Sequence, residues 1–487
     1  MRRALLLLAA AAVAIDTAGL GAQGARYLDP RDVAEAQRQN AELVQELGGA
    51  ETGPRAAYVE SVGRRVAAYT GIVNPGQSFH FTTLNSPVEN AMSVPGGYVY
   101  VTRQLLTIMD NEAELAFALG HETGHIAANH ARSREAYAQR QSVLGVLGAI
   151  FGSVFGGPNN IFSQWATQRA VIATLSFSRE QEYEADRLAT RYLIAAGYDP
   201  AGGPGILAAL ARSSQLEARL QGRAYRQTPE WASTHPLSEN RMQRALADAR
   251  ATGRLGRGVR NRDQFLAEID GLYVDDDPEQ GIVEGPVFTH PDLRIQFQVP
   301  PGYRMSNGTT AVTVSGSAGK AQFSGGRYSG TLEDYTGRVM QSVLQGQQAS
   351  FGAPQRTMIN GMPALVSSAR VFTRSGSIDL SMVAYQWDPQ HIYHFIMLTQ
   401  GGAGIGPFVP MVNSLRRISQ AEAAAIRPRI IDVVTVAPGD TVQSLAGRMA
   451  YRDFKLDRFL SLNGLAANSR LSPGQKVKLV VYGSRRS

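Results

Sequence analysis

Residues 121–125 read His-Glu-Thr-Gly-His, so two histidines stand four positions apart with an acidic residue after the first. On a helix, such positions lie one turn apart on the same face, so His121 and His125 can reach one metal ion. Glu122 stands beside them, placed to take a proton from a water bound to that ion. Because the chain has no cysteine, histidine and carboxylate side chains must supply every metal ligand. The pattern predicts metal-assisted hydrolysis.

A catalytic zinc ion takes three protein ligands and keeps a further position open. A third histidine six residues after His125 would fall on Ala131, and Ala128 replaces the glycine that this arrangement requires. His130 is one residue too early and is expected to point elsewhere. The third ligand must therefore come from another segment of the chain.

An acidic segment downstream, residues 178–186, can supply that ligand. Ser178 with Gln181 is typical of a helix start, and Glu182 and Asp186 then lie one turn apart on one face. Glu182 can ligate the metal while Asp186 accepts a hydrogen bond from the far nitrogen of a ligand histidine and orients its ring. A solvated acidic helix face is the alternative interpretation of this segment.

These segments together resemble the gluzincin peptidases that include the CaaX prenyl protease, HtpX and the periplasmic BepA-type enzymes. Residues 90–101 (Asn-Ala-Met-Ser-Val-Pro-Gly-Gly-Tyr-Val-Tyr-Val) resemble the family's edge strand, which pairs with extended substrate backbone. Residues 234–236 (Thr-His-Pro), with Arg241 beyond them, resemble its His-Pro-x-x-x-x-Arg segment. The likeness covers about residues 30–250 and rests on motifs that occur in the same order.

The resemblance implies one zinc ion per chain, bound by His121, His125 and Glu182, with Glu122 as the general base. It also implies a catalytic position for His235. That histidine would either stabilise the oxyanion or occupy the fourth zinc position and hold the enzyme latent. The supporting residues that the resemblance implies are Asp186 and Arg241 around the metal, and Asn90, Ala91, Pro95, Gly96 and Gly97 along the substrate-binding edge strand.

The composition of the chain changes along its length and predicts several domains. Residues 1–24 carry two arginines, an apolar run and small residues, which is typical of a secretory signal peptide. Residues 25–250 read as a mainly helical, zincin-like metallopeptidase domain with a small β-sheet. Residues 251–286 are rich in Gly, Arg and Asp and are expected to be a linker. Residues 287–419 alternate apolar and polar residues like a small α+β domain of unknown role, with a faint likeness to the PsbP and Mog1-type fold. The remaining histidines, interpreted as structural, are His80, His290, His391 and His394.

The C-terminal tail is basic, with nine Lys or Arg against three Asp in residues 433–487. After a helical linker at 420–432, residues 433–481 resemble a LysM domain, a small βααβ unit that binds N-acetylglucosamine chains such as peptidoglycan. The likeness rests on Val-Thr-Val-Ala-Pro-Gly-Asp-Thr-Val at 434–442 and Pro-Gly-Gln-Lys-Val at 473–477. A small basic domain of other purpose is the alternative.

The leading hypothesis is an exported zinc endopeptidase of the bacterial periplasm, associated with the wall or outer membrane and acting on envelope or misfolded proteins. The rival is a non-enzymatic chaperone or assembly factor with a structural zinc site, and a peptidoglycan-cleaving metallopeptidase ranks below both. Fourteen uncharged residues at 143–156 are compatible with a core helix, a lid or a peripheral membrane contact. No nucleic-acid partner is expected.

Overall fold

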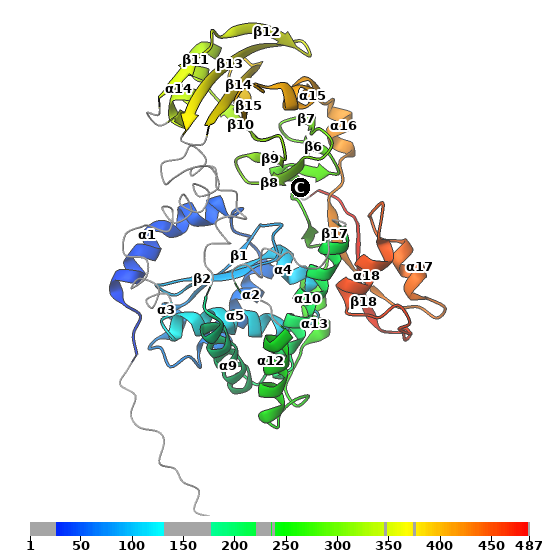
Figure 1. The fold of residues 1–487 in the computed structure, drawn as a ribbon. Coiled ribbons are helices and arrows are strands. Elements are labelled where there is room, and N and C mark those ends of the chain that lie inside the picture. Colours follow the sequence, from blue (N-terminus) through cyan, green and yellow to red (C-terminus); the bar gives the residue numbers. More distant parts are fainter. Residues whose placement is uncertain are drawn as a thin grey trace, which may run out of the picture.

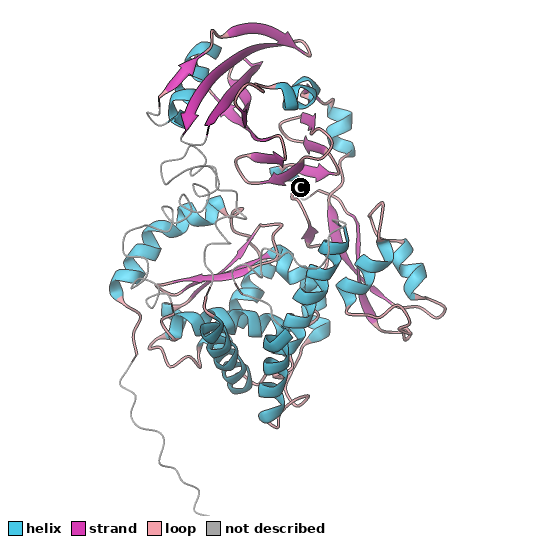
Figure 2. Ribbon diagram, viewed as in Figure 1, coloured by secondary structure: helices cyan, strands magenta, loops and turns pink. Residues whose placement is uncertain are grey.

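The computed structural model describes residues 26–130, 177–220, 235, 239–344, 348–373 and 376–485. Figure 1 shows a helical N-terminal domain, a β-rich middle region above it, and a small C-terminal unit beside α10 of the helical domain. Figure 2 shows that strands dominate the middle region and helices the N-terminal domain. The signal peptide expected at 1–24 and the uncharged run at 143–156 lie outside the described residues. Within the described ranges, no helix is long and apolar enough to cross a membrane.

In the N-terminal domain α2 and α5 pack on one face of a three-stranded sheet and α1 packs on the other, and β3 lies between β1 and β2. β3 runs parallel to β1 and antiparallel to β2, so β2 is an edge strand of this sheet. The elements are α1 (Pro30–Glu46), α2 (Pro54–Ala67), α3 (Pro75–Ser78), β1 (His80–Leu84), β2 (Ala91–Val94), β3 (Tyr98–Thr102), α4 (Arg103–Ile108), α5 (Glu112–Ala127), α9 (Arg179–Ala195), α10 (Gly202–Leu220), α12 (Glu239–Ala251) and α13 (Arg262–Ile269).

Helices α5 and α9 pack directly against each other and carry the predicted metal ligands. The side chain of Asn111 accepts a hydrogen bond from the backbone of Glu114 at the start of α5, and Ser178 forms a full capping box with Gln181 at the start of α9. Gly124 lies at their contact, where a Cβ would stand 3.3 Å from the Cβ of Leu188. The glycine inside the His-Glu-Thr-Gly-His motif therefore allows the two helices to approach closely.

The middle region contains an eight-stranded and a four-stranded antiparallel sheet, with apolar clusters on both faces of the larger one. Helix α14 covers one face, where the Tyr335 hydroxyl lies 2.7 Å from the buried His394 ring. Its elements are β5 (Ile282–Glu284), β6 (Val287–His290), β7 (Ile295–Gln298), β8 (Arg304–Asn307), β9 (Val312–Gly316), β10 (Gly319–Arg327), α14 (Leu332–Leu344), β11 (Ala349–Phe351), β12 (Gln355–Ile359), β13 (Met362–Thr373), β14 (Gly376–Asp388), β15 (His391–Gln400), α15 (Val409–Ser414) and β16 (Arg416–Arg417).

The expectation that residues 251–286 form a linker is wrong. Helix α13 lies within them and is anchored by the fully buried Phe265 and Leu266. The short strand β4 (Tyr273–Val274) pairs with a strand of the C-terminal unit, and β5 joins the four-stranded sheet. Glycine and charge concentrate at the turns between these elements, which is why the composition resembled that of a linker.

The C-terminal unit has the order β17 (Arg429–Thr435), α17 (Val442–Gly447), α18 (Lys455–Asn463) and β18 (Lys476–Tyr482). It follows α16 (Gln420–Ala425), and β17 begins inside the stretch 420–432 that was expected to be a linker. Strand β17 pairs with both β18 and β4, and the apolar core of this unit is continuous with that of the N-terminal domain. The unit is therefore docked on the helical domain rather than joined to it by a free tether.

Candidate metal centre

Three predicted metal ligands converge in the interior of the N-terminal domain, His121 and His125 from α5 and Glu182 from α9. The Nε2 atoms of the two histidines lie 3.0 Å apart. Each of them lies 3.5 Å from one carboxylate oxygen of Glu182. Ligand atoms bound tetrahedrally to zinc at about 2.0–2.2 Å are themselves about 3.3–3.6 Å apart, so the spacing suits that ion.

His235 joins the same group, whose four ligand atoms all lie within 4.8 Å of one another. Its Nδ1 atom lies 3.0 Å from Oε1 of Glu182 and 3.3 Å from Nε2 of His121. Its Nε2 atom lies 3.3 Å from Oε1 of Glu122. One ring nitrogen thus faces the metal ligands while the other faces the predicted general base.

Asp186 and Arg241 hold the ligands in place from behind. Oδ1 of Asp186 lies 2.9 Å from Nδ1 of His121, and the Arg241 guanidinium donates to both oxygens of Asp186 at 2.7 and 2.8 Å. Nη1 of Arg241 also lies 2.7 Å from Oε2 of Glu182. His121 therefore presents Nε2 to the metal position, because its other nitrogen is engaged by a carboxylate.

Electrostatics keep the carboxylates of this centre ionised. Burial would raise the pKa of Glu182, but His235 and Arg241 hold it well below its usual range. Burial would also raise the pKa of Asp186, but the Arg241 guanidinium outweighs burial and lowers that pKa. An anionic carboxylate is the form that binds a cation, so the centre is prepared for a metal.

The surroundings shift the pKa values of the two predicted ligand histidines in opposite directions. Burial lowers the pKa of His125 well below its ordinary value, so its ring is neutral and can donate a lone pair. Burial also acts against the charged form of His121, but hydrogen bonds to Asp186 and Glu182 outweigh it and raise the pKa to about 9. A metal ion at this position would take the place of that proton.

His130 lies outside the group of clustered ligand atoms, as expected, but it contacts the predicted ligand His125 from the far side of that ring. Its Nδ1 atom lies 2.9 Å from Nδ1 of His125, and its Nε2 atom lies 3.3 Å from Oε2 of Glu184. Helix α5 ends at Ala127, and Asn129 adopts a left-handed φ of 57°, which turns the chain back over the helix end. The asparagine was the available sequence signal, because it is a residue that tolerates this conformation.

Replacing His130 with alanine is expected to weaken zinc binding about 10–100-fold, because the His125 ring loses the partner that orients it. Competition with a chromogenic chelator measures the change. His80→Ala is the matched control, since His80 is exposed on β1 and lies outside the group of ligand atoms. Equal zinc affinity in wild type and His130→Ala would contradict this role for His130.

The predicted edge strand lies beside the metal centre. Ser93, on β2, donates a hydrogen bond of 2.9 Å to Oε2 of Glu122 and thereby orients the predicted general base. The turn after β2 uses Gly96 and Gly97 with φ of 94° and 96°, which explains the two consecutive glycines. Asn90 precedes the strand, and its buried side-chain amide has no hydrogen-bond partner among the described residues. Sequence reasoning missed Ser93, because nothing in the local pattern relates it to Glu122.

Two family models match this chain. Residues 54–249 match the model of peptidase family M48, and residues 434–480 match that of the LysM domain. This helical domain belongs to peptidase family M48. The C-terminal unit is a LysM domain, in agreement with its strand–helix–helix–strand order.

Curated relatives match the M48 domain. The beta-barrel assembly-enhancing protease of Escherichia coli K12 is 32% identical over 201 residues, 40% of this chain and 38% of that protein. Its counterpart in Yersinia pestis is 34% identical over 200 residues, 40% of this chain and 38% of that protein. The mitochondrial metalloendopeptidase OMA1 of Schizosaccharomyces pombe is 28% identical over 191 residues, 39% of this chain and 52% of that protein. The chain thus spans between about a third and a half of these relatives.

Among solved structures, the solution structure of cyanobacterial PsbP from Synechocystis sp. PCC 6803 matches 28% of this chain and 98% of that protein. Its sequence identity is 13% and its TM-score is 0.24, values that support no conclusion about the role of the middle region.

Proposed function

We propose that this protein is a zinc-dependent endopeptidase that acts on envelope or misfolded proteins while bound to peptidoglycan. The observation that carries the proposal is the convergence of His121, His125 and Glu182 with Glu122 beside them, inside a domain of peptidase family M48. The zinc ligands would be those three side chains, with one ion per chain. The enzyme names of the relatives support the same reaction class.

The chain's own residues divide the work of hydrolysis. When bound, zinc lowers the pKa of a water ligand toward 7 and polarises the carbonyl that is attacked. Glu122, oriented by Ser93, takes the proton of the attacking water and passes it to the departing amine. Asp186 and Arg241 keep His121 and Glu182 in position during the reaction. The edge strand β2, with Asn90 and Ala91 at its start and residues 95–97 after it, holds extended substrate by backbone hydrogen bonds.

The apparent signal peptide and the LysM domain together support a periplasmic location at the cell wall. Peptidoglycan glycan strands are the proposed partner of the C-terminal unit. A non-enzymatic chaperone with a structural zinc is the second candidate, but a structural site needs only ligands. The buried carboxylate of Glu122 beside the ligands favours the enzyme.

The first test is the zinc content of the mature protein. About one zinc per chain is expected in wild type, and a large loss is expected in His121→Ala and Glu182→Gln because each removes a ligand from a three-ligand site. Elemental analysis after dialysis against a weak chelator gives the stoichiometry. A folded wild-type protein without zinc would remove the basis of the proposal.

His235→Ala is expected to increase the rate of peptide cleavage while weakening zinc binding. The reason is geometric, since Nδ1 of His235 lies among the ligand atoms and would fill the position that substrate needs. Turnover of an unfolded protein substrate, measured at saturating zinc, checks this. If His235 instead stabilised the oxyanion, the rate would fall about 10²–10³-fold.

A further inference from the structure

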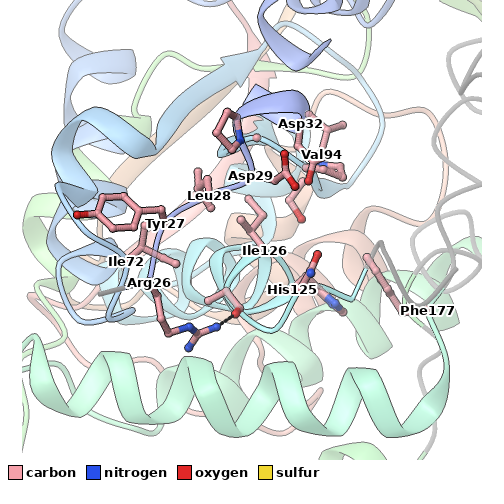
Figure 3. Close-up of a pocket in the computed structure, with 16 residues that line it drawn as sticks. Arg26, Tyr27, Leu28, Asp29, Asp32, Ile72, Val94, His125, Ile126 and Phe177 are labelled. Atoms are coloured by element: carbon pink, nitrogen blue, oxygen red, sulfur yellow. Dashed lines mark hydrogen bonds between the residues drawn. The ribbon is translucent and has the colours of Figure 1, made fainter. Parts of the chain in front are cut away.

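A cavity of about 460 Å³ opens beside the metal centre, on the side of His125 (Figure 3). Its lining runs from His125 and Phe177, past residues 93–96 at the end of the edge strand, to residues 26–32. We call residues 26–32 the N-terminal segment. It precedes residue 54, where the match to family M48 begins, so the family likeness does not describe this wall of the cavity.

Several contacts fix the N-terminal segment against the cleft. The Arg26 guanidinium donates to the carbonyl of Ala127 at the end of α5 (Figure 3), and the Arg26 carbonyl accepts from the Val73 backbone at 2.8 Å. Farther along, a Cβ on Gly96 would stand only 2.5 Å from the Asp32 carbonyl. The segment is therefore held between the helix that carries the zinc ligands and the turn that follows the edge strand.

The cavity is suited to a large side chain with an apolar body. Its walls have apolar side chains on opposite sides, and Asp29 and Asp32 lie together with Val94 on the side away from Arg26 (Figure 3). A peptide extended along β2 would pass the metal position and continue over this cavity, because Ser93 of β2 contacts Glu122 and also lines the cavity. The apolar side chains in the lining are Leu28, Ile72, Val94, Ile126 and Phe177.

We propose that the N-terminal segment is a substrate-binding wall of the peptidase and selects a bulky apolar residue on the His125 side of the scissile bond. This inference rests on the proposed endopeptidase function. A pocket of this kind discriminates between large and small apolar side chains about 10–200-fold. Leu28 is the main selecting residue, and Arg26 positions it by fastening the segment to Ala127.

Profiling of cleavage sites in a degenerate peptide library, with zinc-loaded mature protein, tests the wall. At one position beside the scissile bond, wild type should cleave peptides with a bulky apolar residue about tenfold or more faster than peptides with alanine. Leu28→Ala and Arg26→Ala should each reduce that preference to near unity while zinc content stays unchanged. Arg38→Ala is the matched control, since Arg38 lies on α1 outside the cavity lining and is largely exposed.

A second measurement does not depend on turnover. The library peptide that wild type cleaves best should bind to zinc-loaded Glu122→Gln about tenfold more tightly than the same peptide with alanine at the selected position. Adding Arg26→Ala to that variant should remove this difference in affinity. An unchanged preference in both variants would overturn the role of the segment even though cleavage itself persists. If zinc-loaded protein neither cleaved nor bound any peptide, the result would contradict both the proposed endopeptidase function and the substrate-binding role of the N-terminal segment.

Discussion

Replacing Glu122 with glutamine is expected to reduce peptide cleavage by about 10²–10⁴-fold while zinc stays bound. The amide has nearly the shape of the carboxylate but cannot accept the proton of the attacking water. The three proposed zinc ligands are untouched, and Ser93 still has an oxygen to donate to. Initial rates on an unfolded protein substrate, together with metal analysis of the same sample, measure both halves of the prediction.

Glu180→Gln is a suitable control for this variant, because it makes the same chemical change on an exposed side chain of α9 outside the group of ligand atoms. It should retain most of the wild-type rate. Normal biological activity of Glu122→Gln in cells that lack the wild-type protein would favour the chaperone interpretation over the enzyme.

Lys478→Met is expected to destabilise the protein by about 1–3 kcal/mol, although Lys478 lies in the LysM domain. Its ammonium is completely buried and donates to the carbonyls of Thr107 and Met109 at 3.0 and 2.6 Å, at the end of α4. It also lies 3.2 Å from Oδ1 of Asp110, next to the start of α5, the helix that carries two of the proposed zinc ligands. Methionine fills the space but leaves these acceptors without a donor. Urea unfolding of the zinc-loaded protein measures the loss.

The effect should also depend on pH. Burial and the neighbouring Asp110 raise the pKa of Glu114 to about 7, against the influence of Lys478, which lowers it. When the pKa of a carboxyl group is higher in the folded than in the unfolded state, the fold loses stability as pH rises from the unfolded-state pKa through the folded-state pKa. Without Lys478 the folded-state pKa of Glu114 rises further. Lys478→Met should therefore reduce the free energy of unfolding more at pH 8 than at pH 5.5. Lys476→Met, a partly exposed position on the same strand, should change stability by less than about 1 kcal/mol at either pH.

Local patterns in the sequence were sufficient for the features that depend on one segment. The spacing of His121 and His125 predicts that their rings share a helix face, and the structure places both on α5 with their Nε2 atoms 3.0 Å apart. The capping pair Ser178 and Gln181 predicts the start of α9, and the structure has it there. The LysM domain was equally readable, because its turns and strands lie within fewer than 50 consecutive residues.

Tertiary structure decided the contacts between residues far apart in the chain. The Ser93–Glu122 hydrogen bond, the His130 ring against His125 and the burial of Lys478 beneath α4 have no periodic signature. They depend on how helices, sheet and C-terminal unit pack. The supposed linker at 251–286 shows the same limit, since short elements rich in glycine and charge gain their stability from the surfaces that they join. A sequence records local propensity directly, whereas long-range contacts arise only from packing of the whole chain.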